Sequence, residues 1–248
     1  MNSAPAATTH SDAPARDPLL QVEALTAGYG RTTVLRDVTL NFDSGSVTAV
    51  LGANGAGKTT LLRCLSGLIR ATSGTISMGQ TDVSRLPPHR RLKQGICLIP
   101  EGRGVFKSLT VAENLRLHRP NWQAEERTDS ALEIFPALRP RLSQTTGTMS
   151  GGEQQMVALA RAFVAGASLV MVDELSMGLA PRVVEDLFDR LALLAQRGVA
   201  LIVVEQFVHQ ALALADTVVV LNRGEIALHA RAADFDPSVL AQQYLGAH

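Results

Sequence analysis

The chain has 248 residues, enough for one large domain or two small ones with a substantial core. It carries 23 basic and 23 acidic residues, so its net charge of zero gives no electrostatic basis for general binding to nucleic acid or to an anionic membrane. No apolar run approaches the roughly 18 residues that a membrane-spanning helix requires, so we expect any role at a membrane to depend on a partner.

Short β-branched runs alternate with helical patterns along most of the chain. We expect strands at 19–25, 33–42, 46–51, 74–78, 96–100, 168–173, 200–204, 217–221 and 225–229. Apolar residues at helical spacing predict helices at 58–69, 110–118, 124–134, 151–165, 181–196 and 206–215. Several strands are apolar on both faces, as in a parallel sheet covered by helices. We therefore expect the early and late strands to form one α/β sheet, with a mostly helical lobe inserted at about 84–165.

Two further features concern the N-terminus and the cysteines. Residues 1–17, MNSAPAATTHSDAPARD, are small and polar and lack the apolar core of a secretory signal, so we expect a disordered tail. Cys64 and Cys97 lie in apolar segments, which indicates buried, reduced thiols of a cytosolic protein and not a disulfide or a metal site.

The stretch GANGAGKTT at 52–60 fits the pattern G-x-x-x-x-G-K-[ST] between a strand and a helix. Its glycines let backbone N–H groups curve around phosphate oxygens, and the start of the helix favours an anion. Lys58 can reach the β- and γ-phosphates, and the Thr59 hydroxyl can ligate Mg²⁺. The alternative is a chance glycine-rich turn, but the strand and helix around it favour nucleotide binding. The predicted binding residues are Gly52, Ala53, Asn54, Gly55, Ala56, Gly57, Lys58, Thr59 and Thr60.

Asp173 and Glu174 follow the apolar run SLVMV. Two adjacent carboxylates are costly to bury unless a cation or a reacting water needs them. We therefore predict that Asp173 holds Mg²⁺ and that Glu174 polarises the attacking water. The alternative is a solvated strand end with two ordinary acids.

The stretch MSGGEQQMVALARA at 149–162 begins a helix, with Ser150 as N-cap and Glu153 three residues later. By itself this is only a capping box. Between the phosphate loop and the acidic strand, however, it gives an ordered set that resembles the nucleotide-binding subunits of ATP-binding cassette (ABC) transporters, from about Leu19 onward. The resemblance implies an ATPase domain at 18–248 with a P-loop NTPase core, a mixed, mainly parallel sheet, an N-terminal antiparallel β portion and an inserted helical subdomain.

The resemblance also implies how a site is completed. Ser150, Gly151 and Gly152 match the signature motif, which contacts the γ-phosphate of ATP held by the opposite subunit, so a monomer should bind ATP but hydrolyse it poorly. The segment 177–180 matches the loop that joins the two sites of the dimer. Tyr29 matches the aromatic residue that stacks on adenine; the alternative is an ordinary tyrosine of the core or a strand end.

Short strings carry a narrower resemblance to the importers of branched-chain amino acids and their urea and amide relatives. They are PEGRGVF (100–106), SMGLAP (176–181), VVEQ (203–206), LPPHRR (86–91) and YLG (244–246). The implied cofactors are ATP and Mg²⁺. The implied partners are transmembrane permease subunits, a second ABC ATPase subunit and, indirectly, a solute-binding protein, with no nucleic acid and a peripheral place at the cytoplasmic face of the membrane. The alternatives are a soluble ABC-type ATPase of DNA repair or translation, and a clamp that binds ATP without hydrolysing it.

Four predicted strands end in motif residues, namely Gly52, Glu101, Asp173 and Gln206, and ligands bind beyond such strand ends in a doubly wound sheet. We therefore expect Gln206 at the γ-phosphate and His209, three residues on, at the helix surface or in packing. Most of the family has histidine at the Gln206 position and glutamine at the Glu101 position, close to Mg²⁺. The predicted catalytic residues are Glu174, Lys58 and Gln206, and the predicted metal ligands are Thr59, Asp173 and Glu101.

Two other positions depart from the family pattern. Leu175 replaces the usual proline, and we expect it to loosen the turn that presents Glu174. Met149 replaces the usual leucine, which conserves apolar volume.

Overall fold

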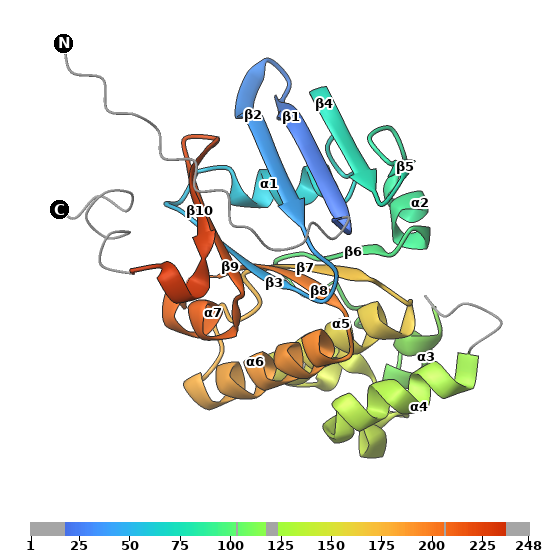
Figure 1. Cartoon of the computed structure of the whole chain (residues 1–248). Coiled ribbons are helices and arrows are strands. Elements are labelled where there is room, and N and C mark those ends of the chain that lie inside the picture. Colours follow the sequence, from blue (N-terminus) through green and yellow to red (C-terminus); the bar gives the residue numbers. More distant parts are fainter. Residues whose placement is uncertain (1–17, 103, 118–123, 206, 237–248) are drawn as a thin grey trace, which may run out of the picture.

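The computed structural model describes residues 18–102, 104–117, 124–205 and 207–236 (Figure 1). The tail predicted at 1–17, Gln206 and the YLG string at 244–246 lie outside these residues. No helix in the described part of the chain is both long and apolar enough to cross a membrane.

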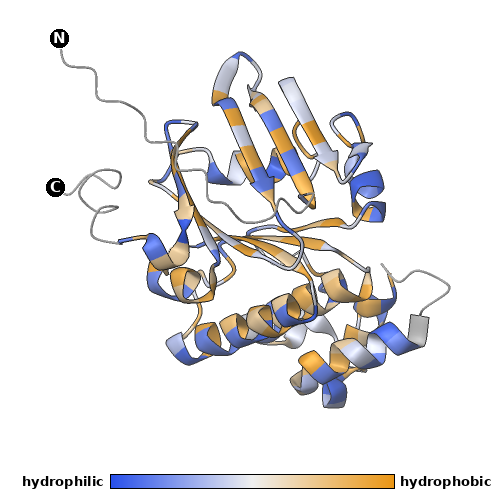
Figure 2. Ribbon diagram, in the orientation of Figure 1, coloured by the Kyte–Doolittle hydropathy of each residue, from blue (hydrophilic) through white to orange (hydrophobic). Residues whose placement is uncertain are grey.

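The first strands form an antiparallel sheet in the order β2-β1-β4-β5. Its strands are β1 (Leu20–Tyr29), β2 (Thr32–Phe42), β4 (Ala71–Met78) and β5 (Thr81–Asp82). In β1 and β2, buried positions are interspersed with exposed ones, as expected for strands that bury one face and leave the other to solvent. Figure 2 shows the same alternation of polar and apolar residues along these strands.

The second sheet has six strands in the order β10-β9-β3-β8-β7-β6. The strands are β10 (Glu225–Arg231), β9 (Thr217–Asn222), β3 (Val47–Leu51), β8 (Ala200–Val204), β7 (Leu169–Asp173) and β6 (Ile96–Ile99). The strands β9, β3, β8, β7 and β6 are parallel to one another, whereas β10 pairs with β9 in the antiparallel direction. Every residue of β3, β7 and β8 is buried.

The expectation of one sheet for the early and late strands is therefore wrong. Only β3, among the strands before residue 71, belongs to the central sheet. The physical difference is burial: β3 is covered on both faces, whereas β1 and β2 bury one face and pair with each other. The predicted fold class, with a mainly parallel sheet and a separate antiparallel portion, is confirmed.

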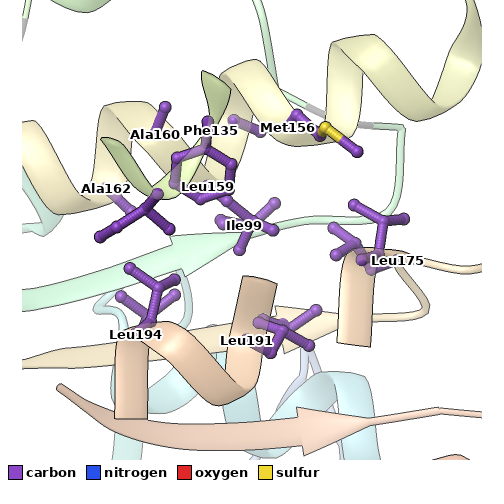
Figure 3. Packing of buried hydrophobic residues seen from close by; sticks show 14 of the residues in the cluster. Ile99, Phe135, Met156, Leu159, Ala160, Ala162, Leu175, Leu191 and Leu194 are labelled. Atoms are coloured by element: carbon purple, nitrogen blue, oxygen red, sulfur yellow. The ribbon is translucent and has the colours of Figure 1, made fainter. Parts of the chain in front are cut away.

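Helices cover the two faces of the central sheet unequally (Figure 1). On one face lie α1 (Lys58–Leu65) and the antiparallel sheet, packed on alternate residues such as Leu169 and Met171. On the other face lie several helices, packed on Val170 and Val172, together with Leu175, Leu191 and Leu194 of the same core (Figure 3). These are α3 (Val111–Arg116), α4 (Ala124–Ile134), α5 (Gly151–Val164) and α6 (Pro181–Gln196).

The remaining helices are short. They are α2 (Pro88–Lys93), α7 (Val208–Leu214) and 3₁₀ turns at Pro136–Arg141, Thr146–Thr148 and Ala232–Asp234. The sequence pattern did not indicate α2. The segment predicted as a helical lobe contains α2 to α5, but it also contains β6, which pairs with β7 in the central sheet.

Candidate active site

The glycine-rich loop at 52–57 connects β3 to α1. Gly52, Gly55 and Gly57 have φ of 148°, 80° and 111°, which favour glycine. A Cβ at Gly52 would lie 2.3 Å from the carbonyl oxygen of Leu221, so the close approach of the loop to β9 excludes any side chain there. In the described part of the chain, the N–H groups of the first helical residues, 58–60, donate to no other group. The loop and helix start thus form a cradle for an anion.

Lys58 lies folded over this cradle. Its Nζ donates to the carbonyl oxygens of Gly52 at 2.8 Å and of Ala53 at 3.1 Å. Partial burial lowers the pKa of Lys58, and the nearby carboxylates of Glu174 and Asp173 act in the opposite direction. The ammonium can therefore exchange two carbonyl partners for phosphate oxygens without leaving the mouth of the loop.

The Thr59 hydroxyl joins the cradle to the end of β7, since its Oγ1 donates to Oδ1 of Asp173 at 3.1 Å. Asp173 is 3% exposed. Burial raises its pKa, the Thr59 hydrogen bond opposes this, and the charges of Glu174 and Glu101 add to the increase. Glu101 follows β6 and is exposed.

These oxygens fit Mg²⁺. The cation prefers a few oxygen ligands from protein, with phosphate and water completing its shell. A hydroxyl and a buried carboxylate in contact provide such a set, and a metal there would neutralise a charge that burial disfavours. No group of three or more His, Cys, Asp or Glu side chains among the described residues could hold a metal by itself, so phosphate oxygens and water would complete the shell.

Glu174 is presented by a strained turn after β7. Its φ of 49° lies in the left-handed region, and its N–H donates to the Val204 carbonyl oxygen at 2.9 Å. Leu175 is buried in the core, and its carbonyl oxygen accepts from Nε2 of Gln155 at 2.9 Å. The Leu175 side chain therefore joins the turn to the core, and its backbone joins the turn to α5.

The sequence analysis did not single out Glu205, which follows β8 next to the end of β7. Its carboxylate is buried and accepts from the backbone N–H of Ser176 at 3.1 Å and from the Ser176 hydroxyl. Because β7 and β8 are parallel neighbours with Asp173 opposite Val204, the residues after the two strands meet. An acidic residue at the end of an apolar strand, as in VVE, was the available signal. His209 is exposed on α7, as predicted.

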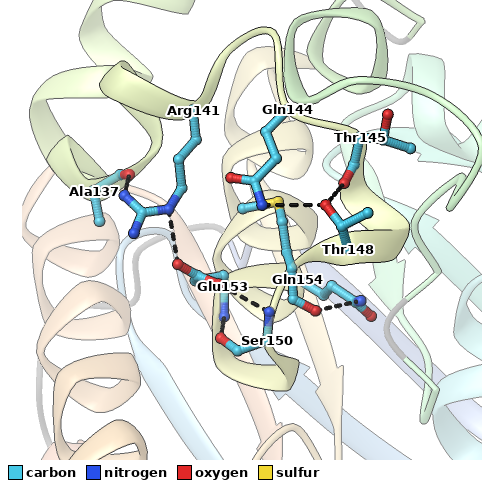
Figure 4. A network of polar contacts seen from close by, with 9 residues as sticks. Ala137, Arg141, Gln144, Thr145, Thr148, Ser150, Glu153 and Gln154 are labelled. Atoms are coloured by element: carbon cyan, nitrogen blue, oxygen red, sulfur yellow. Dashed lines mark hydrogen bonds and ion pairs between the residues drawn. The ribbon is translucent and has the colours of Figure 1, made fainter.

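The Ser150–Gly152 segment lies at the start of α5 (Figure 4). Ser150 Oγ accepts from the Glu153 N–H at 3.3 Å, Glu153 Oε2 accepts from the Ser150 N–H at 2.8 Å, and Arg141 pairs with the same carboxylate at 2.8 Å. This capping box is the predicted one. Ser150 is exposed, and within the described residues no hydrogen bond joins 150–152 to the loop at 52–60.

Tyr29 ends β1 with its side chain 46% exposed. Its hydroxyl accepts from Arg63 of α1 at 3.4 Å, which places the ring beside the helix that starts at the cradle. The ring is thus available for stacking. Met177, at the start of the segment 177–180, is also exposed.

Comparison with known proteins gives a consistent result. The family model described as ABC transporter matches residues 35–176. The high-affinity branched-chain amino acid transport ATP-binding protein BraG of Pseudomonas aeruginosa is 40% identical over 216 residues, covering 85% of this chain and 92% of its own. The probable branched-chain amino acid transport ATP-binding protein LivF of Archaeoglobus fulgidus is 39% identical, covering 86% and 92%.

Solved structures agree on the fold. An ATP-binding subunit of an ABC transporter has a TM-score of 0.76 at 30% identity, covering 87% of this chain and 91% of its own. The ADP conformation of an ATP-binding cassette of an ABC transporter has a TM-score of 0.81 at 23% identity, covering 91% and 96%.

Proposed function

The chain belongs to the ABC transporter family and is an ATPase of the ABC type, and from this we propose that it energises an importer for branched-chain amino acids or for a urea- or amide-type solute. The observation that carries the catalytic part of the proposal is the contact between Thr59 of the glycine loop and Asp173. The two relatives at 39–40% identity support the solute class.

We assign the nucleotide contacts as follows. The N–H groups of the 52–60 loop bind the phosphates, Lys58 contacts the β- and γ-phosphates, and Tyr29 stacks on adenine. Thr59 and Asp173, with Glu101 nearby, would hold Mg²⁺. When bound, Mg²⁺ would neutralise charge on the β- and γ-phosphate oxygens.

Glu174 is the proposed general base. It follows the metal-binding aspartate directly, and its turn is fixed by the bond to Val204. Its carboxylate would orient the attacking water and accept its proton. Gln206 would donate an amide hydrogen bond to the γ-phosphate but, unlike histidine, could not carry a proton.

A second subunit would complete the site. Ser150, Gly151 and Gly152 are not bonded to the phosphate loop of their own chain, and Ser150 is exposed. We propose that these residues act on ATP held by a second copy or by a related ABC subunit.

The contact with the permease subunits is proposed at an apolar groove of about 340 Å³ between α2, β6 and α5. Beside it, Phe106 is 48% exposed and lies under the guanidinium of Arg161, 5.1 Å from the ring centroid. Cys97 lines this groove and is only partly buried, so the expectation that both cysteines are core thiols holds for Cys64 alone. Docking here would place the chain at the cytoplasmic face of the membrane as a peripheral subunit.

The test is phosphate release from the assembled complex, with the chain co-produced with its two hydrophobic permease proteins. Glu174→Gln should lower turnover by about 100-fold or more, because general-base catalysis contributes on that order, while ATP binding persists. Equal rates for the variant and the wild type would instead support the non-hydrolysing clamp. Failure to associate with membranes containing the permeases would contradict the transport role.

A further inference from the structure

Arg91 of α2 is a cation in the protein interior, with 1% of its surface exposed. Its guanidinium donates to four backbone carbonyl oxygens: Nη1 to Cys64 and Leu65 at 2.8 Å each, Nη2 to Ser84 at 2.8 Å and Nε to Leu86 at 3.1 Å. These bonds use nearly all of its five donors. The side chain therefore joins two chain segments, the end of α1 and the residues just before α2.

One of these segments is the end of the phosphate-loop helix. Cys64 and Leu65 belong to the last turn of α1, whose carbonyls carry the negative end of the helix dipole, and that of Cys64 also accepts from the Gly67 N–H at 3.1 Å. The same helix starts at Lys58, so its eight residues span about 12 Å between the phosphate cradle and Arg91. A displacement at one end of so short a helix is transmitted to the other.

Gly67 shows how closely the guanidinium fits. Its φ is 80°, and a Cβ there would lie 2.9 Å from Nε of Arg91 and 2.9 Å from the Leu86 carbonyl oxygen. A left-handed glycine just after the helix leaves room for the cation.

The helix that carries Arg91 forms a wall of the groove. Pro88, His89 and Leu92 of α2 line it, as does Leu68 from the chain just after α1. Arg91 is on the same helix, and its guanidinium reaches the end of α1. Arg91 therefore bonds the end of α1 to the helix that lines the groove.

We propose that Arg91 is a positioning residue that couples nucleotide occupancy of the phosphate loop to the conformation of the α2 wall of the groove. The inference rests on the proposed function, since it assigns a means of communication between the nucleotide site and the surface proposed for the permease. Coupling of this kind is reciprocal, so a partner in the groove changes nucleotide affinity by the same factor.

Hydrogen–deuterium exchange of residues 84–99, read by mass spectrometry with and without Mg-ADP, tests the coupling on the full chain without a partner. In the wild type, we expect Mg-ADP to slow exchange in this segment by about 5-fold, the lower end of typical couplings. Arg91→Lys should retain nucleotide binding, measured by calorimetry, but lose most of this difference. Arg90→Lys is the matched control, because Arg90 is the exposed neighbour and should keep the full effect.

A merely structural role would raise exchange of Arg91→Lys equally with and without nucleotide and leave the ratio intact, which would overturn the proposal. The same holds if Mg-ADP binds the wild type but leaves exchange at 84–99 unchanged. If Arg91→Lys does not fold, Gly67→Ala replaces it, since the new Cβ would displace the guanidinium, and a retained ratio there would again refute the idea. Absence of any nucleotide binding by the wild type would be a failure of the proposed function itself.

Discussion

The Thr59–Asp173 hydrogen bond predicts the effect of Thr59→Val, which removes the hydroxyl and keeps the branched shape. The bond is 3.1 Å long and its acceptor is a carboxylate that is 3% exposed. Hydrogen bonds to charged groups contribute about 1.5–3 kcal/mol, and a buried carboxylate that loses a donor cannot replace it with bulk water. We therefore expect the free energy of unfolding to fall by that amount.

For a domain of this size, 1 kcal/mol corresponds to about 2–4 °C in Tm, so Thr59→Val should melt about 3–12 °C below the wild type without nucleotide. Thermal unfolding followed by circular dichroism measures this. In the wild type, ADP with Mg²⁺ should raise Tm more than ADP alone does. In Thr59→Val the two increases should be equal, because the variant lacks the Thr59 hydroxyl, which with Asp173 is proposed to bind Mg²⁺.

The matched control is Thr75→Val. The Thr75 hydroxyl also donates to a carboxylate, that of Glu23 at 3.3 Å, but this pair is exposed. Its loss should change stability by no more than about 0.5 kcal/mol. If Thr59→Val and Thr75→Val lower Tm by the same amount, burial of Asp173 does not strengthen its hydrogen bond, and the reasoning is refuted.

Three further variants follow from the structure. Burial raises the pKa of Asp173, so the folded state binds this proton more tightly than the unfolded chain does. The stability that Asp173 contributes is therefore present at acid pH and is lost as the pH rises through the raised pKa. In urea titrations from about pH 4 to 8, Asp173→Asn should flatten this pH dependence and stabilise the nucleotide-free protein at about pH 8. Gly224→Ala places a Cβ 1.7 Å from the Val34 carbonyl oxygen at a φ of 86°, so it should lower the free energy of unfolding in urea by about 3 kcal/mol or more. Its control is Gly79→Ala, which has a φ of 54° and open space around the Cβ and should lower that free energy by about 1 kcal/mol. Gln206→His should preserve or raise phosphate release, and a collapse of turnover would mean that the site depends on the amide.

The glycine loop and the acidic pair could be placed at strand ends from the sequence because the chemistry proposed for them fixes both residue type and order. A glycine is required where a Cβ would lie 2.3 Å from the carbonyl oxygen of Leu221 in β9, and the carboxylates must follow a buried parallel strand. Both requirements are local. The sequence therefore located Gly52 and Asp173 without any knowledge of which strands are neighbours.

What could not be predicted depends on tertiary contacts. The helix α2 has no apolar stripe, and its buried side chain is Arg91, which periodicity alone would place in solvent. The contact between Glu205 and Ser176 depends on β8 lying beside β7, and the sequence of neither strand indicates that they are neighbours. The division into two sheets likewise follows from which strands are covered on both faces.

That division has a consequence for the choice of nucleotide. The phosphate cradle directly follows β3 of the central sheet, whereas Tyr29 is the last residue of β1 in the antiparallel sheet. A tyrosine ring offers its flat face, which guanine can use as well as adenine, and face-to-face contact carries no donor or acceptor with which to tell purines apart. The proposed stacking on Tyr29 would therefore not by itself distinguish ATP from GTP, and we expect the chain to hydrolyse both.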